Sequence, residues 1–131
     1  EEARLIHLAA GYGVDIGGST GVVIDIGGGS VEVTLGTARQ MTLGRSFKVG
    51  VIRLTERFVK SDPLSGRDEH RLVKHLNREM GDYLDQVAQR GYDRVIGTSG
   101  TILSLGSLAA QQHVSAEELR NLRVPAKALS R

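Results

Sequence analysis

The stretch GVVIDIGGGSVEV, residues 21–33, guides the interpretation of the whole chain. Residues 21–26 are a continuous run rich in β-branched side chains, which predicts a buried strand. The three glycines at 27–29 form a turn, and apolar and polar residues then alternate over 31–35, which predicts a second strand with one polar face. We expect a third strand over residues 38–44, so that the three strands form an antiparallel meander.

Glycine-rich sequence also precedes this stretch. Residues 3–10 are compatible with a helix, and we expect the glycines between Gly11 and Gly18 to end that helix in a loop. The pattern at Asp15–Ser19 resembles the one that begins at Asp25, but it does not follow a clear buried strand. We interpret it as a linker, with a second anion site as the alternative. Because the chain begins with Glu1 rather than Met, we expect it to be a piece of a longer protein.

The second half of the sequence predicts helices around one more strand. Apolar residues recur at three- and four-residue steps from Leu72 to Val87, which predicts a long helix. Ser65 or Asp68 could cap its start, and Gly91 suits its end. The other expected elements are a short helix over 49–59, a strand over 94–96, a helix over 102–109 and a last short helix from the capping box of Ser115 and Glu118.

Composition narrows the class of protein. The 131 residues suffice for one domain, with an ordinary 40% hydrophobic and 24% charged content. Cysteine is absent, which excludes disulfides and thiolate metal sites and fits a reducing compartment, so we expect a cytoplasmic protein. No apolar run is long enough to cross a membrane. A net charge of +2 gives no reason to expect nucleic acid as a partner.

The glycines suggest a site for anions. There are 17 of them, where average usage of roughly 7% would give about nine. Gly27, Gly28 and Gly29 lack side chains, so several backbone N–H groups can converge on an anion there, and Ser30 can add a hydroxyl donor. Asp25 would suit Mg²⁺, and Glu32 could face a phosphate or an attacking water. The alternative is a plain glycine-rich hairpin with a solvent-facing Asp25.

A second candidate lies at the junction that follows the strand over 94–96. It consists of Gly97, Thr98, Ser99, Gly100 and Thr101. A strand–loop–helix junction offers free N–H groups and three hydroxyls to an anion. The alternative is that Thr101 only caps the following helix. The segment is not a P-loop, because no lysine follows the second glycine.

Other charged residues carry weaker signals. Glu1 and Glu2 precede an apolar helix, as solvated first-turn carboxylates often do. The histidines have no spacing that predicts a shared metal site. Eight basic residues gather between Arg45 and Lys74, where they could form a solvated face or line a path for a polyanion.

Four segments in order resemble the Ppx/GppA phosphatase family. They are residues 1–6 (EEARLI), 23–32 (VIDIGGGSVE), 50–56 (GVIRLTE) and 97–101 (GTSGT), and the resemblance covers roughly residues 1–110. It implies an α/β fold of the actin/hexokinase (ribonuclease H-like) type, with a mixed sheet of about four or five strands and flanking helices. The chain would be the second actin-like domain of a two-domain hydrolase, with the first domain absent.

The resemblance also implies an activity and roles for individual residues. The family removes terminal phosphates from polyphosphate or guanosine pentaphosphate with Mg²⁺. Glu2 matches the catalytic base, Glu32 a second acidic residue at the reacting phosphate, and Asp25 the aspartate on the metal side. The phosphate-binding residues would be Gly27, Gly28, Gly29, Ser30, Gly97, Thr98, Ser99, Gly100 and Thr101.

The missing first domain leads to further expectations. Half of a cleft has no complete site, so we expect this chain alone to be inactive or nearly so. The family resemblance also suggests that the complete protein is a homodimer. Two alternatives remain: a non-catalytic module that senses a nucleotide or alarmone, and a sugar-kinase-like or chaperone-like ATPase domain. Retention of both Glu2 and Glu32 favours the hydrolase.

Overall fold

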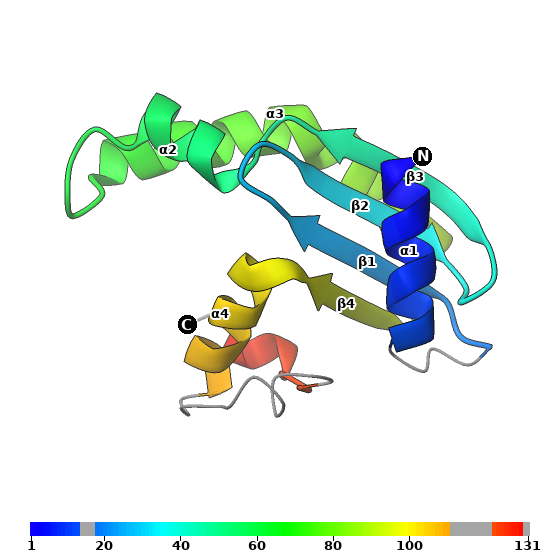
Figure 1. The fold of residues 1–131 in the computed structure, drawn as a ribbon. Coiled ribbons are helices and arrows are strands. Elements are labelled where there is room, and N and C mark those ends of the chain that lie inside the picture. The colour runs from blue at the N-terminus through cyan, green and yellow to red at the C-terminus, as the bar shows by residue number, and fades with distance from the viewer. Residues whose placement is uncertain (14–17, 111–121, 130–131) are drawn as a thin grey trace.

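The computed structural model describes residues 1–13, 18–110 and 122–129 (Figure 1). In this part of the chain, four strands form one mixed sheet in the order β3-β2-β1-β4. They are β1 (Gly21–Ile26), β2 (Val31–Gly36), β3 (Met41–Phe47) and β4 (Arg94–Thr98). The first three strands form the predicted antiparallel meander, and β4 pairs with β1 in parallel.

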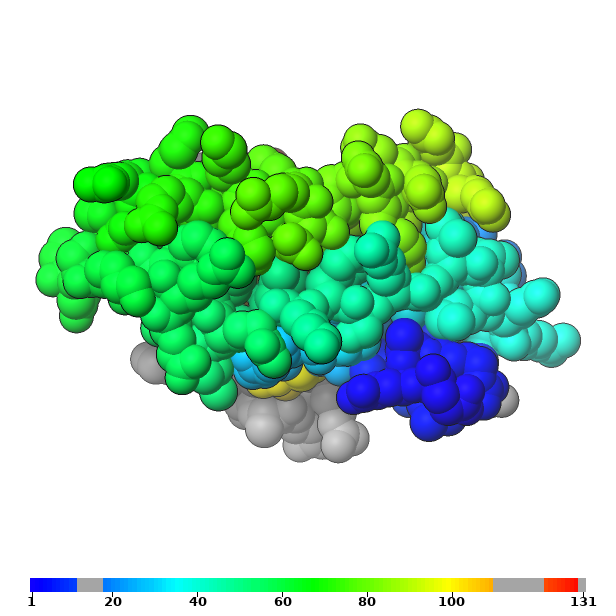
Figure 2. All heavy atoms as spheres, turned by 90° about the horizontal axis from the view of Figure 1, so that it is seen from above, coloured from blue at the N-terminus to red at the C-terminus, as the bar shows by residue number. Residues whose placement is uncertain are grey.

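Helices cover both faces of this sheet. α1 (Glu2–Gly13) crosses one face and α3 (Gly66–Arg90) lies along the other, so that the sheet is the middle layer (Figures 1 and 2). α2 (Val51–Phe58) joins β3 to α3, and α4 (Ser99–Ala110) follows β4. A 3₁₀ turn, η1, spans Ala126–Ala128. Within the described ranges, every helix is too short or too polar to span a lipid bilayer.

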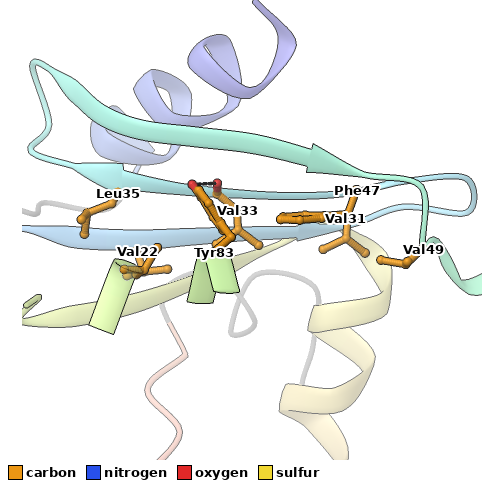
Figure 3. Close-up of a cluster of buried hydrophobic side chains, with 8 residues drawn as sticks. Val22, Val31, Val33, Leu35, Phe47, Val49 and Tyr83 are labelled. Carbon is orange, nitrogen blue, oxygen red and sulfur yellow. Dashed lines mark hydrogen bonds between the residues drawn. The ribbon is translucent and has the colours of Figure 1, made fainter. Parts of the chain in front are cut away.

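The main core lies between the sheet and α3. Alternate residues of β2 at 31, 33 and 35 point to this side, as the period of two requires. There they meet Tyr83 and Val87 of α3 (Figure 3). The buried members of the cluster are Val22, Val31, Val33, Leu35, Phe47, Val49, Tyr83 and Val87.

The opposite face of β2 is polar, but it is also covered. All six residues of β2 are buried, including Glu32 and Thr34, and α1 packs across that face at Thr34. His7 of α1 is fully buried, with 2.6 Å from its Nδ1 to Thr34 Oγ1 and 2.8 Å from its Nε2 to the Thr37 carbonyl. This pair of hydrogen bonds satisfies the buried imidazole and fixes α1 on the central strand.

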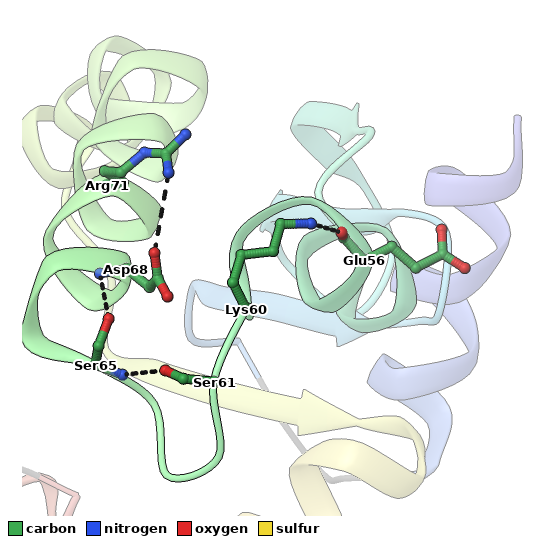
Figure 4. A network of polar contacts seen from close by, with 6 residues as sticks. All are labelled: Glu56, Lys60, Ser61, Ser65, Asp68 and Arg71. Carbon is green, nitrogen blue, oxygen red and sulfur yellow. Dashed lines mark hydrogen bonds and ion pairs between the residues drawn. The ribbon is translucent and has the colours of Figure 1, made fainter.

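The long helix begins and ends as predicted. Ser65 is the N-cap of α3, and its hydroxyl accepts a hydrogen bond from the Asp68 amide at 3.2 Å. Ser61 holds Ser65 in turn, and Arg71 approaches Asp68 at 3.9 Å (Figure 4). At the other end Gly91 has a φ of 77°, a left-handed conformation that glycine adopts without strain.

Two predicted boundaries in the N-terminal part of the chain were wrong. The third strand lies at Met41–Phe47 instead of 38–44, because residues 37–40 form a turn in which the Thr37 amide donates to the Gln40 carbonyl at 2.9 Å. The first helix continues through Gly11 to Gly13. Gly11 allows close packing there, since a Cβ at this position would lie 2.9 Å from the Ala38 Cα.

The other predicted elements either appear with small shifts in their bounds or lie outside the described residues. The short helix expected over 49–59 is α2, and the strand expected over 94–96 extends to Thr98 as β4. The linker at Asp15–Gly17 and the capping box of Ser115 and Glu118 lie outside the described residues.

Tyr83→Phe should lower the free energy of unfolding by about 1 kcal/mol. The Tyr83 hydroxyl donates to the Val33 carbonyl at 2.7 Å inside the core, and phenylalanine keeps the ring but loses this bond. Denaturant titration of the chain measures the effect. Tyr92→Phe is the matched control, because Tyr92 is exposed and should change stability by less than about 0.5 kcal/mol. Equal losses in the two variants would contradict the assigned role.

The same hydroxyl should make stability sensitive to alkali. Burial raises the pKa of Tyr83, and the nearby positive charge of Arg45 opposes this only in part. The unfolded tyrosine titrates near pH 10, so its stabilising contribution is complete below about pH 10 and is lost as the pH rises toward the raised folded-state pKa. The stability difference between the parent chain and Tyr83→Phe should therefore shrink above about pH 10. A constant difference from pH 8 to 11 would contradict this.

Candidate functional site

The sheet topology places the two glycine motifs at one edge. β1 and β4 are parallel neighbours, so their carboxyl ends meet at the same end of the sheet (Figure 1). Asp25 pairs with Thr98 in this register. One step further on, the Ser99 hydroxyl donates to the Ile26 carbonyl at 2.9 Å. The glycine turn and the first turn of α4 therefore lie side by side at this edge of the sheet.

Polar side chains form a row across the sheet beside this edge. Asp25 of β1 lies between Thr98 of β4 and Glu32 of β2, and Glu32 in turn pairs with Ser46 of β3. Directly opposed residues point to the same face of a sheet. It is the face covered by α1, because Thr34 lies two residues beyond Glu32 on β2. The row therefore presents two carboxylates and two hydroxyls on one surface.

Glu32 is held in place within this row. It is only 4% exposed, and its Oε1 accepts hydrogen bonds from the hydroxyls of Ser30 and Ser46, each at 2.7 Å. Two such bonds from either side fix the carboxylate in one orientation. The Ser30 hydroxyl was expected to donate to a bound anion, but in this structure it donates to Glu32 instead.

Asp25 differs from Glu32 in its surroundings. It is half-buried, and among the described residues no hydrogen bond or ion pair engages its carboxylate. It lies directly opposite Glu32, and like charges at opposed positions of two strands are unfavourable. A cation at this place would relieve that repulsion.

These residues fit a magnesium ion shared with a substrate. Across the described ranges, His, Asp and Glu do not gather in any group of three or more that could hold a metal on its own. Mg²⁺, however, is commonly held by one or two carboxylates together with substrate phosphates and water. Asp25 would hold it, and the remaining ligands would come from outside the chain.

The glycine turn is shaped by the start of α2. Its three carbonyl groups all accept hydrogen bonds from backbone N–H groups of that helix. Gly27 accepts from Val51 at 3.0 Å, Gly28 from Ile52 at 3.0 Å, and Gly29 from Gly50 at 3.3 Å. All three carbonyls are therefore directed toward α2.

This arrangement leaves the other side of each peptide free. In a planar trans peptide the N–H points opposite to the C=O. The N–H groups of Gly28, Gly29 and Ser30 are thus directed away from α2, and none has an acceptor within the described part of the chain. Three successive free N–H groups can form a cradle for an anion. This geometry favours the anion-site interpretation over a plain glycine-rich hairpin.

Two glycines lie at the close approach of turn and helix, and Gly50 is required there because a Cβ would meet backbone atoms. A Cβ on Gly50 would lie 2.3 Å from the Gly28 carbonyl oxygen, far inside van der Waals contact. A Cβ on Gly28 would lie 2.9 Å from the Cδ1 of Ile52. The part played by Gly50 was not predicted, although residues 50–56 carried a family resemblance, because the pattern did not reveal which groups contact each other.

The second motif is a tighter junction than predicted. Gly97 and Thr98 belong to β4, and α4 begins at Ser99 instead of at residue 102. Ser99 has a φ of 79°, a strained conformation for a residue with a side chain. Gly97 makes room for Ile102, whose Cγ2 would lie 2.1 Å from a Cβ there. The first-turn N–H groups of α4, at Ser99, Gly100 and Thr101, are thereby brought to the sheet edge.

Glu2 is not brought into contact with these residues. It lies in the first turn of α1, its side chain is exposed, and among the described residues it makes no hydrogen bond or ion pair. Glu1 beside it pairs with Arg4 at 2.6 Å. Glu2 precedes the sheet-facing His7 by five residues, which is about 140° around a helix. Its side chain therefore does not point at the row that contains Asp25 and Glu32.

Comparison with known proteins extends over nearly the whole chain. The model of the Ppx/GppA phosphatase family matches residues 1–130. A guanosine-5'-triphosphate,3'-diphosphate pyrophosphatase of Photobacterium profundum is 28% identical over 112 residues, which is 86% of this chain and 22% of that protein. A similar protein of Vibrio vulnificus is 29% identical over the same length. The chain thus spans about a fifth of these relatives.

Solved structures show the same fold. An exopolyphosphatase of Cytophaga hutchinsonii superimposes with a TM-score of 0.78 at 27% identity, over 88% of this chain and 38% of that one. The Ppx/GppA family member of Aquifex aeolicus gives 0.75 at 27% identity, over 90% and 37%. The predicted actin-like α/β fold, a mixed sheet with flanking helices, is confirmed. The chain belongs to the Ppx/GppA phosphatase family.

Proposed function

We propose that the chain is the second actin-like domain of a phosphoanhydride hydrolase that removes the terminal phosphate from polyphosphate or guanosine pentaphosphate. The observation that carries this proposal is the cradle of three free N–H groups at Gly28, Gly29 and Ser30, next to the opposed carboxylates of Asp25 and Glu32. Names of relatives, which include an exopolyphosphatase and a pentaphosphate pyrophosphatase, support the substrate class.

Each group in the site has a task in such a reaction. The cradle would bind phosphoryl oxygens and stabilise the negative charge that builds on them as the bond to the leaving group breaks. The first-turn N–H groups of α4, at Ser99, Gly100 and Thr101, would face the same anion from the neighbouring strand. Mg²⁺, held by Asp25, would supply further charge neutralisation when bound.

The carboxylates of Glu32 and Glu2 would act on the attacking water. Glu32 is fixed through its Oε1, and its Oε2 has no hydrogen-bond partner among the described residues, so that oxygen can orient a water molecule. The family resemblance assigns the role of general base to Glu2. For that role Glu2 must approach the phosphate from the α1 side, which requires a substrate that extends beyond the sheet edge.

The other wall of the cleft would come from a first actin-like domain. Compared with its relatives, the chain represents about a fifth to two fifths of a protein. We propose that the chain alone is inactive, that the complete protein is cytoplasmic, and that it forms a homodimer. Exposed leucines of α4 at 103, 105 and 108 offer apolar surface for a neighbouring domain or subunit.

Glu32→Gln should lower kcat for phosphate release about a hundredfold or more. Glutamine keeps an oxygen that can accept from Ser30 and Ser46, so the fold is retained while the negative charge is lost. The assay measures phosphate released from polyphosphate, guanosine pentaphosphate and ATP with Mg²⁺, by the protein that unites this chain with its first domain. Glu56→Gln, on the exposed surface of α2, is the matched control. Full activity of Glu32→Gln would remove Glu32 from the mechanism.

The same assay tests the alternative of a sensor module. No release of phosphate from any of the three compounds, together with tight nucleotide binding, would replace the hydrolase by that module. Release from only one of the first two compounds would identify the substrate.

Asp25→Asn should raise the Mg²⁺ concentration needed for half-maximal activity by about tenfold or more, because a neutral amide oxygen is a weaker ligand for a hard cation. A Mg²⁺ titration of phosphate release at fixed polyphosphate measures this. Asp82→Asn, an exposed position on α3, loses the same charge away from the site and should behave as the parent protein does. An unchanged Mg²⁺ requirement in Asp25→Asn would show that the ion is held elsewhere.

A further inference from the structure

The glycine turn has one side-chain contact in addition to the backbone bonds from α2. Arg53, in the first turn of α2, donates from its Nε to the Gly29 carbonyl at 3.1 Å. This carbonyl also accepts from the Gly50 amide at 3.3 Å, whereas the Gly28 carbonyl accepts from the amides of Ile52 at 3.0 Å and Arg53 at 3.4 Å. The guanidinium therefore adds a second donor to a carbonyl whose single backbone hydrogen bond is long.

The turn needs this reinforcement more than an ordinary turn would. Glycine loses more conformational freedom on folding than any other residue, and here three follow in succession. Each peptide plane can rotate unless its carbonyl is held, and a rotated plane turns its N–H away from the anion. The direction of the Ser30 N–H thus depends on the carbonyl of Gly29, because both belong to one planar peptide.

We propose that Arg53 is a positioning residue, which sets the direction of the cradle N–H groups by holding the Gly29 carbonyl from the opposite side. The proposal rests on the proposed function for its effect on turnover. Arg53 is exposed and contacts the turn on the side away from the cradle, so it acts through the peptide and not on the phosphate. A charged donor on a carbonyl also polarises the peptide, which makes its N–H a stronger donor to an anion.

The helix that carries Arg53, α2, is itself anchored to α3. At the far end of α2, Phe58 is buried and its ring lies 5.1 Å from the ring of His75 on α3, centroid to centroid. The helix that carries Arg53 is therefore fixed to the longest helix of the fold. Arg57, one turn further along, lies over the Phe58 ring at 5.2 Å and does not reach the glycine turn.

Arg57→Met is accordingly the matched control for Arg53→Met. Both variants remove one positive charge from the exposed surface of the same helix, and methionine and arginine have similar helix propensities. A general loss of electrostatic attraction for a polyanion would affect both variants alike. A loss of positioning would affect only Arg53→Met. Arg53→Lys should retain part of the positioning and therefore show a smaller defect than Arg53→Met.

The first readout is amide hydrogen exchange of the chain without substrate. In Arg53→Met, the amides of Gly50, Val51 and Ile52, which donate to the turn, should exchange about three- to tenfold faster than in Arg57→Met. Global unfolding of both variants is measured alongside, so that a general loss of stability is recognised. Unchanged exchange in Arg53→Met would overturn the proposal, whatever the activity.

The second readout is phosphate release by the protein that unites this chain with its first domain. Arg53→Met should lower kcat about tenfold, while KM changes by less than about twofold and the salt dependence stays the same. The reason is that a misdirected N–H loses its hydrogen bond mainly to the charge that develops in the transition state. A raised, salt-dependent KM with normal kcat would overturn the proposal in favour of a direct phosphate contact. If the parent protein releases no phosphate but the exchange difference persists, only the proposed function fails and the positioning role stands.

Discussion

The hydrogen bonds between the glycine turn and the start of α2 are the constraint on which the site depends. A helix begins with N–H groups that have no partner inside it, and Gly50 at the N-cap of α2 has no side chain that could cap them. A turn of three glycines has carbonyls that no side chain of the turn itself can fix. Each set satisfies the other, and the exchange requires contact so close that Gly50 must lack a Cβ. The orientation of the cradle follows from this contact and not from the glycines alone.

The register of the sheet supplies the second half of the arrangement. Parallel pairing of β1 with β4 brings the junction at Ser99 to the glycine turn, and antiparallel pairing of β1 with β2 sets Asp25 against Glu32. A slip of one residue in β2 would turn Glu32 into the apolar core beneath α3 and Val33 toward α1. Burial of both faces of β2 excludes that slip. The same packing that stabilises the core therefore also fixes the distance between the two carboxylates.

The sequence predicted the elements better than their contacts. Periodicity located the strands and the long helix, and the cap at Ser65 and the ending at Gly91 followed from local chemistry. The prediction that Gly11 ends the first helix was wrong, because the helix continues through Gly11 in close packing with Ala38. The third strand begins later than predicted, because residues 37–40 form a turn. In the site, Asp25, Glu32 and the glycines were identified as candidates. The contributions of Ser46, Gly50 and Arg53 were missed, because their roles arise from contacts across 14 to 24 residues that no local pattern encodes.

The three acidic residues of the proposed site, Glu2, Asp25 and Glu32, differ in environment, and the difference suits them to different parts of the proposed reaction. Glu32 is buried and held through one oxygen by two hydroxyls, so it can present the other oxygen without moving but cannot rotate to bind a metal on both oxygens. Asp25 is half-buried and unengaged within the described residues, so its carboxylate can turn toward a cation. Glu2 is exposed on a helix that the buried His7 fixes to the sheet. The backbone position of Glu2 is therefore fixed, while its side chain can change rotamer. The proposed site has one rigid carboxylate, one adaptable carboxylate and one on the outer surface of α1, and it would be complete only when a second domain brings substrate across to Glu2.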